Sequence, residues 1–243
     1  MKIVLDIETV PAPRQEWARI RSIELVEPPE AISQDNMDLF TYAEYEERLT
    51  KEKELYERSA FDGTFSRIVV IGVLVFSDSM APQGAIAWYG ENEVELLCQF
   101  WEYMRQLRPA LFITHNGLGF DLPFIKKRSM IHQVKPPFEI NLAKFRTEPV
   151  YDTMAIWSNW DMRNWVKLDV LAKALNVETK SGSGAQVGEM WAKGYRKEMA
   201  EYCLQDTFVT YGCYCRMTFR NLHHRDEVLE ATELIDVDNS LPI

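Results

Sequence analysis

The stretch KIVLDIE, residues 2–8, opens the chain with apolar, largely β-branched residues and then two acids. The apolar part predicts a buried β-strand, which the prolines at positions 11 and 13 end. Asp6 and Glu8 are two positions apart, so a strand presents both side chains on one face. Neighbouring carboxylates repel each other unless a cation lies between them. The pair therefore indicates either a metal site or a strand end at which one acid lies in water.

Strand-like and helix-like stretches alternate along the rest of the chain. We expect strands at 67–76, 84–90 and 110–117, and helices at 41–59, 92–107, 121–131 and 196–222. This order predicts an α/β fold with a mixed sheet flanked by helices. The motifs described below fall in one domain, residues 1–225, with a long insertion at about 12–66. The acidic residues 226–243 are interpreted as a C-terminal tail that is partly frayed.

The composition is that of a globular protein with a sizeable core: 243 residues, 47% hydrophobic and 26% charged. The longest apolar run, Ile68–Phe76, is too short for a membrane span, and the N-terminus lacks the pattern of a signal peptide. The four cysteines lack the spacing of a zinc site or of a disulfide framework. These features predict a cytoplasmic protein with free thiols and no membrane association.

The net charge of −10 argues against a nucleic-acid partner, but the charge is unevenly spread. Residues 105–225 carry 18 Lys and Arg against 11 Asp and Glu. Several of these cations lie near the motifs described below: Lys126, Lys127, Arg128, Lys180, Lys193, Arg196 and Lys197. Each is as readily explained by a solvated helix face. Together they predict a groove that contacts a few phosphates.

Two further acids could meet the pair on the first strand. Asp121 follows the stretch HNGLGF and begins a predicted helix, where the helix dipole favours an acid in any case. Asp206 lies four residues after Tyr202 in YCLQD, so a helix places both on one face; in isolation such a tyrosine most often only packs. Four carboxylates without Cys or His ligands suit Mg²⁺ or Mn²⁺ rather than zinc.

Three stretches in order resemble the exonuclease motifs of the DEDD 3′–5′ exonucleases: DIET at 6–9, NGLGFDLPF at 116–124 and YCLQD at 202–206. The chain is most similar to the proofreading exonuclease domain of family B DNA polymerases and to related stand-alone exonucleases. The spacing Tyr-x-x-x-Asp is that of the tyrosine branch. The resemblance extends from residue 3 to about residue 220, although no polymerase domain accompanies it.

The resemblance implies a ribonuclease-H-like fold with a mixed five-stranded sheet and two bound ions, Mg²⁺ or Mn²⁺. It implies that the metal ligands are Asp6, Glu8, Asp121 and Asp206, and that Tyr202 positions the attacking water. It places Thr9 and Val10 beside the terminal nucleotide, and Asn116 and Phe120 along the path of the strand. Asp152 matches an accessory acid of the family and is not expected to be a ligand.

The implied activity is a 3′–5′ exonuclease that releases nucleoside 5′-monophosphates from single-stranded or frayed DNA ends, in DNA replication or repair. RNA remains open as a substrate, because no residue here recognisably reads a 2′-hydroxyl. An inactive relative that only binds nucleic acid or scaffolds a replication complex is the other reading. The protein partner, the oligomeric state and the role of the insertion are left open by the sequence.

Overall fold

The structure is a computed structural model that describes residues 1–27, 39–178 and 187–239. By internal contacts the chain divides into two compact units. The larger unit comprises Met1–Glu8 and Ile68–Ile243, and the smaller unit is Thr9–Arg67. The smaller unit covers the insertion predicted at about 12–66. Lys180 of the predicted basic groove lies outside the described residues.

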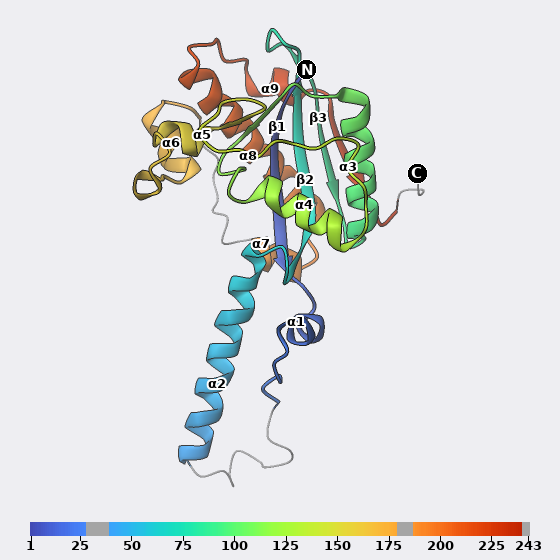
Figure 1. Cartoon of the computed structure of the whole chain (residues 1–243), viewed down its shortest axis with the longest axis vertical. Coiled ribbons are helices and arrows are strands. Elements are labelled where there is room, and N and C mark those ends of the chain that lie inside the picture. The colour runs from blue at the N-terminus through green and yellow to red at the C-terminus, as the bar shows by residue number, and fades with distance from the viewer. Residues whose placement is uncertain (28–38, 179–186, 240–243) are drawn as a thin grey trace. The chain divides into compact units, whose positions relative to one another are not determined.

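A six-stranded sheet in the order β5-β4-β1-β2-β3-β6 organises the fold (Figure 1). Its strands are β1 (Lys2–Pro11), β2 (Ser66–Phe76), β3 (Pro82–Tyr89), β4 (Leu111–Thr114), β5 (Val150–Asp152) and β6 (Thr232–Asp236). β1 is parallel to β4, β4 to β5 and β3 to β6, whereas β2 and β3 are antiparallel. The predicted fold class, a mixed α/β sheet with the ribonuclease-H-like arrangement, is confirmed.

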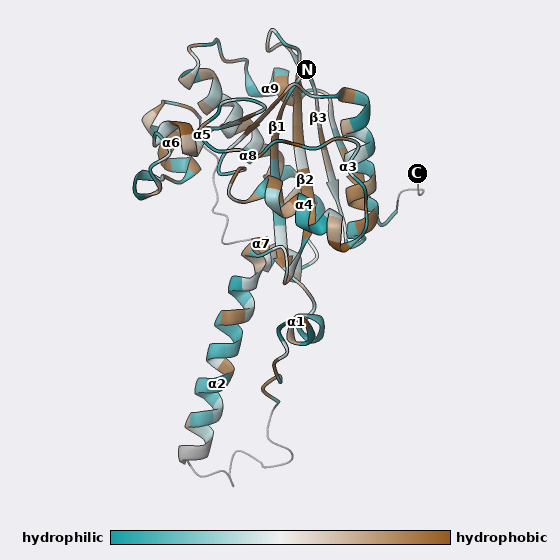
Figure 2. Ribbon diagram, viewed as in Figure 1, coloured by the Kyte–Doolittle hydropathy of each residue, from teal (hydrophilic) through white to brown (hydrophobic). Residues whose placement is uncertain are grey.

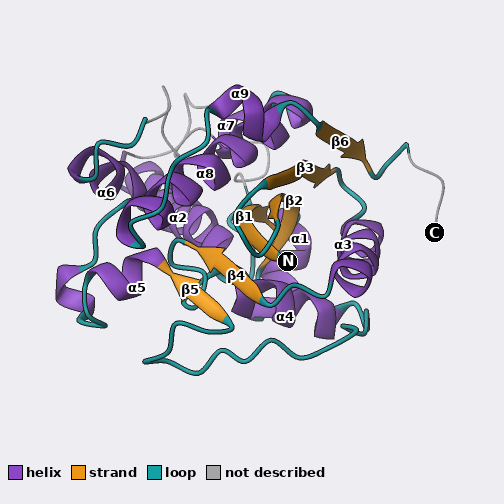
Figure 3. Ribbon diagram, turned by 90° about the horizontal axis from the view of Figure 1, so that it is seen from above, coloured by secondary structure: helices purple, strands orange, loops and turns teal. Residues whose placement is uncertain are grey.

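Helices cover both faces of this sheet. They are α3 (Glu93–Leu107), α4 (Asp121–Ile131), α5 (Thr153–Trp157), α6 (Leu168–Ala174), α7 (Val187–Ala192), α8 (Arg196–Met217) and α9 (Arg225–Leu229). Figure 3 shows α3 and α4 on one face, and α8 and α9 on the other. Among the described residues, no helix is both long enough and apolar enough to cross a bilayer.

The main core lies between the sheet and the helices α3 and α4. Ile3, Leu5 and Ile7 of β1 are buried there together with Phe100 of α3 and Ile125 of α4. Because side chains alternate across a strand, Asp6 and Glu8 lie on the opposite face of β1, toward α8. The alternation that the sequence predicted for this strand therefore assigns the acids to one particular layer of the molecule.

The sheet has one strand more than expected. The stretch 226–243 was interpreted as a frayed acidic tail, but its described part forms α9 and then β6. β6 pairs with β3 over Thr232–Asp236, and Val237 just beyond it is buried. Glu233 and Asp236 hide this strand in the sequence, because they interrupt its apolar residues and leave no continuous apolar run.

The smaller unit contains α1 (Arg14–Arg21), α2 (Leu39–Arg58) and a short 3₁₀ helix (Ser59–Phe61). Trp17 is fully buried and meets the ring of Tyr56 edge-on at 5.2 Å. The buried Glu52 carboxylate accepts hydrogen bonds from Arg14 Nε at 2.7 Å and from the backbone N–H of Val26 at 2.6 Å. Figure 2 shows α2 as mostly hydrophilic.

Candidate active site

The site begins where β1 extends past its neighbour β4. The two strands pair from Lys2 and Leu111 to Val4 and Ile113, and β4 ends at Thr114. Beyond that point the backbone N–H of Ile7 donates to Asp121 Oδ1 at 3.1 Å instead of to a strand. The first residue of α4 is thereby joined to β1 between the two acids of that strand.

Asp121 is held by the turn that precedes it. Asn116 has a φ of 67°, and a Cβ at Gly117 would lie 2.4 Å from Thr114, so this turn requires glycine. The Asp121 side chain is 3% exposed, and its burial, opposed in part by hydrogen bonds from backbone N–H groups, raises its pKa to about 7. Such a carboxyl group is costly to ionise unless a cation accompanies it.

The third element of the site is α8, which packs closely on the sheet. Cys203 is fully buried, and a Cβ at Gly72 of β2 would lie 2.8 Å from its Sγ. The thiol lies 3.4 Å from the backbone oxygen of Asp6 and 3.5 Å from Asp6 Oδ2. Gly72 thus permits the close approach that brings α8 to the acidic face of β1.

The pKa shifts show that the four predicted acids share one electrostatic environment. The pKa of Asp6 is raised well above its usual value, first by burial and then by the negative charges of Asp121, Glu8 and Asp206. The pKa of Tyr202 is raised by burial and then by Asp206, Glu8 and Asp6. The acids predicted from three separate motifs are therefore close neighbours of Asp6, and the Tyr202 phenol lies in their field.

The donor atoms fit a divalent cation. Asp6, Glu8 and Cys203 each offer one ligand atom, and these atoms lie within 4.8 Å of one another. Burial, followed by the neighbouring carboxylates, raises the pKa of the Cys203 thiol well above its usual value, so it stays protonated and is a poor ligand. The carboxylate oxygens that remain suit a hard ion such as Mg²⁺ or Mn²⁺.

Asp152 supports the loop before α4. From the sequence it was predicted only as an accessory acid that is not a ligand. Its carboxylate caps α5 by accepting from the backbone N–H groups of Met154 and Ala155 at 3.1 and 3.2 Å. It also accepts from the N–H groups of Asn116 and Leu118, each at 3.0 Å. These four bonds occupy the carboxylate and fix the loop that leads to Asp121. The sequence signal was an acid at the end of a short strand, directly before a helix, which is the pattern of a helix cap.

The residues predicted to contact substrate lie on β1, next to its acids, and in the loop before α4. Thr9 and Val10 follow Glu8 on β1; the Thr9 hydroxyl donates to the backbone oxygen of Ala60 at 2.7 Å, and Val10 is buried. Asn116 is partly exposed in the loop held by Asp152. Phe120 is also partly exposed, and its ring meets Phe124 edge-on at 5.3 Å.

The structure corrects the predicted basic groove at three of its seven cations. Arg128 is buried and forms an ion pair with Glu93, with Nη2 to Oε2 at 2.6 Å. Lys193 pairs with Glu189, and Arg196 pairs with Glu91. These cations are neutralised locally because each has an acid within reach on its own or a facing element. Lys126 and Lys127 remain exposed on α4.

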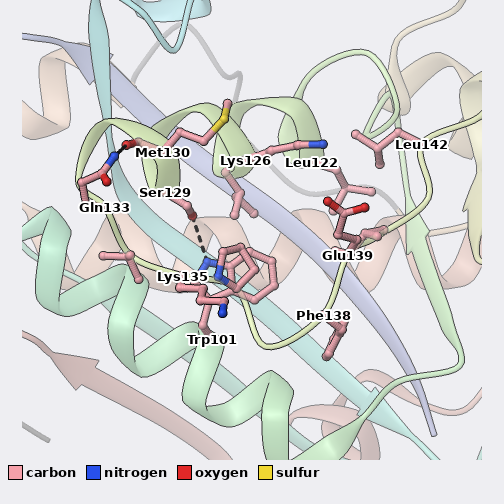
Figure 4. A pocket seen from close by; sticks show the side chains of 14 residues that line it. Trp101, Leu122, Lys126, Ser129, Met130, Gln133, Lys135, Phe138, Glu139 and Leu142 are labelled. Atoms are coloured by element: carbon pink, nitrogen blue, oxygen red, sulfur yellow. Dashed lines mark hydrogen bonds between the residues drawn. The ribbon is translucent and has the colours of Figure 1, made fainter.

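An apolar hollow of about 510 Å³ lies beside α4 but is separate from the acids. Figure 4 shows its lining, in which the indole N–H of Trp101 donates to Ser129 Oγ at 2.9 Å. Leu122, Met130 and Phe138 also line it, and none of the predicted site residues does. The chemistry described above therefore belongs to the β1, α4 and α8 junction.

Comparison with known proteins identifies the family. Residues 60–237 match a family model described as "Predicted 3'-5' exonuclease related to the exonuclease domain of PolB". The matched region contains Asp121, Tyr202 and Asp206 and begins after Asp6 and Glu8.

Similar curated proteins include catalytic subunits of DNA polymerase epsilon. The one from Saccharomyces cerevisiae is 32% identical over 145 residues, which is 55% of this chain and 6% of the yeast protein. One from Arabidopsis thaliana is 30% identical over 139 residues, 53% of this chain and 6% of the plant protein. The chain thus spans a small part of the length of these relatives. The predicted resemblance is confirmed: the chain belongs to the family of 3′–5′ exonucleases related to the exonuclease domain of PolB.

Proposed function

We propose that this protein is a two-metal-dependent 3′–5′ exonuclease that releases nucleoside 5′-monophosphates from single-stranded or frayed DNA ends. The observation that carries the proposal is the convergence of four carboxylates from β1, α4 and α8, with the phenol of Tyr202 beside them. DNA is preferred to RNA because the similar proteins are named as DNA polymerase subunits. Their names also favour a role in DNA replication or repair.

Asp6, Glu8, Asp121 and Asp206 would hold the ions. When bound there, two divalent ions would supply the chemistry that polarises the phosphodiester, activates a water and stabilises the leaving oxygen. Burial and then the charges of neighbouring acids raise the pKa values of Asp6 and Asp121, so a bound cation would compensate the charge of these two carboxyl groups.

Tyr202 would position the attacking water. Because its pKa is raised above the usual value of a phenol, Tyr202 keeps its proton around neutral pH and can donate a hydrogen bond. Thr9 and Val10 would contact the terminal nucleotide, while Asn116 and Phe120 would border the strand. Asp152 would act through the loop that it holds, and so it is a positioning residue.

Cleavage of end-labelled DNA tests this proposal. Single-stranded oligonucleotides labelled at the 5′ end should yield a ladder that shortens progressively, whereas 3′-labelled ones should release labelled mononucleotide at once. Both products should require Mg²⁺ or Mn²⁺, disappear with chelator and be absent from the Asp206→Asn variant. Internal cuts, or shortening from the 5′ end, would refute the proposed polarity.

A further inference from the structure

Three of the seven tryptophans lie close together in the sequence, between positions 157 and 165, and all three reach the surface. Trp17, Trp88 and Trp101 are buried, and Trp191, which lies apart from residues 157–165 in the sequence, is partly exposed. By contrast, Trp157 and Trp165 are 43% and 37% exposed, and Trp160 is partly exposed. Burying an indole normally contributes strongly to stability, so exposed indoles close together mark a surface that meets a partner.

A fourth aromatic ring from another segment joins this group. Phe145 is 76% exposed, and its ring lies 5.3 Å from that of Trp160 at an interplanar angle of 48°. We call Phe145, Trp157, Trp160 and Trp165 the aromatic surface. Residues 157–165 contain short helical turns: α5 ends at Trp157, and a 3₁₀ turn spans Met162–Asn164.

Three exposed cations flank the aromatic surface. Lys144 and Arg146 bracket Phe145, and Lys167 follows Trp165 by two residues. Within the described residues no ion pair involves any of them, whereas Arg163 is paired with Asp161 at 2.9 Å. Exposed aromatic rings with exposed cations next to them in the sequence are complementary to the bases and phosphates of a single-stranded nucleic acid.

The aromatic surface is connected to the candidate active site. His115, at the end of β4, lies with Nδ1 2.9 Å from Thr153 Oγ1 and Nε2 3.1 Å from the backbone oxygen of Val166. Val166 lies between Trp165 and Lys167, and Thr153 begins α5. Asp169, two residues after Lys167, is among the charges that raise the pKa of Tyr202. Figure 3 shows α5 continuing from β5 at the edge of the sheet.

We propose that the aromatic surface, with Lys144, Arg146 and Lys167, binds the single-stranded part of the substrate that leads to its 3′ end. This inference rests on the proposed function, and it adds a binding region outside the acidic centre. Bases stack on the aromatic rings irrespective of sequence, and the cations contact backbone phosphates. The enzyme thereby prefers strands long enough to reach from the acids to this surface.

The test measures binding without cleavage. Every variant is made in the Asp206→Asn background, and binding of fluorescent single-stranded DNA is followed by anisotropy. The combined change Phe145→Ala and Trp165→Ala should raise the Kd for an oligonucleotide of about 12 nucleotides by roughly tenfold or more, and that for one of about 3 nucleotides by less than about twofold. Trp165→Phe keeps an aromatic face and should retain most of the affinity.

A matched pair of charge variants tests the phosphate contacts. Lys144→Ala with Arg146→Ala should reduce the slope of log Kd against log salt by about 1.4, since each single-strand phosphate contact contributes about 0.7. Arg108→Ala with Lys135→Ala removes the same two residue types at the far end of α3 and should leave the slope unchanged. Phe219→Ala, which removes a ring that is 98% exposed after the end of α8, is the control for the aromatic changes.

The outcomes separate this inference from the proposed function. If the aromatic and charge variants bind like their controls while the Asp206-intact enzyme degrades DNA, the aromatic surface is not a strand-binding region and the proposed function stands. If the long strand binds through the aromatic surface but the protein that retains Asp206 cleaves nothing, the aromatic surface is a strand-binding region and the proposed function is refuted. Absence of both binding and cleavage would overturn both.

Discussion

At the residue scale, Tyr202 and Asp206 lie one helical turn apart on α8, and their surroundings give them different chemistry. Both are partly buried beside Asp6 and Glu8. The raised pKa of Tyr202 keeps its phenol neutral, so it is a hydrogen-bond donor and a poor ligand for a cation. Asp206 contributes negative charge to the same cluster.

The change Tyr202→Phe separates these roles. If the hydroxyl aligns the attacking water, the variant should lose about 10²-fold in single-turnover cleavage. A tyrosine that only packs would lose about 1 kcal/mol of stability and little activity. Affinity for Mn²⁺ should not change, whereas Asp206→Asn should weaken it. A Phe variant as fast as the wild type would assign Tyr202 to packing alone.

Asp121 gives the apo protein a pH dependence whose sign follows from its pKa. In the unfolded chain the carboxyl group titrates near pH 4, and in the folded protein at about 7. Between these values the folded state binds more protons, so the free energy of unfolding should fall as the pH rises, by up to about 1.4 kcal/mol per pH unit for this group.

The matching measurement is urea unfolding in chelator between about pH 4 and pH 7. Asp121→Asn cannot titrate and can still accept from the Ile7 N–H, so its stability should depend less steeply on pH than that of the wild type. Identical slopes for the two proteins would show that Asp121 is ionised in the fold without cost.

At the scale of elements, the site depends on how closely α8 approaches β2 and on how the loop before α4 is held. The close contact of Gly72 with Cys203 sets how closely α8 approaches β2. The four hydrogen bonds that Asp152 accepts from backbone N–H groups hold the loop before α4. Neither the Gly72–Cys203 contact nor the hydrogen bonds of Asp152 take part in the proposed reaction, yet each determines where an acid of the site lies.

Gly72→Ala should displace α8, because the new Cβ would lie 2.8 Å from Cys203 Sγ. We expect a loss of about 1–3 kcal/mol in stability, as for other overpacked cores, together with reduced turnover. Adding Cys203→Ala removes the clashing sulfur, so the double variant should be more stable and more active than additivity predicts. Purely additive effects would contradict the packing explanation.

Asp152→Ala should cost about 1–3 kcal/mol of stability, since it leaves a helix cap and two loop N–H groups without their partner. It should also lower turnover, because the loop that places Asp121 is released. The control is Asn92→Ala. The Asn92 side chain caps α3 by accepting from the backbone N–H of Glu95, and the change removes this cap. It should cost about 1 kcal/mol without an effect on turnover; equal kinetic effects would deny Asp152 its positioning role.

At the scale of the whole molecule, the sequence predicted the elements that local patterns specify. The strand of residues 2–8 and the helices starting at 93, 121 and 196 agree with the structure because apolar periodicity and caps are local signals. β6 was missed because its pairing with β3 joins distant parts of the chain. The ion pairs of Arg128 and Arg196 were missed for the same reason, since Glu93 and Glu91 are far away in sequence.

The candidate site was predictable only in part for similar reasons. The three motifs indicated which acids to consider, and the structure brings them together around Asp6. Cys203 beside Asp6 and the supporting bonds of Asp152 depend on tertiary packing, for which a single sequence offers no spacing rule. The aromatic surface likewise becomes apparent only when exposure is known.

The central claim is that four carboxylates form a site for divalent ions, and calorimetric titration with Mn²⁺ tests it most directly. The wild type should bind Mn²⁺ at up to about millimolar concentration and gain thermal stability on binding, because the ions relieve repulsion that exists only in the folded state. Asp6→Ala should lose the heat of binding and the thermal shift while remaining folded. A wild type that shows neither effect at millimolar Mn²⁺ would contradict the claim.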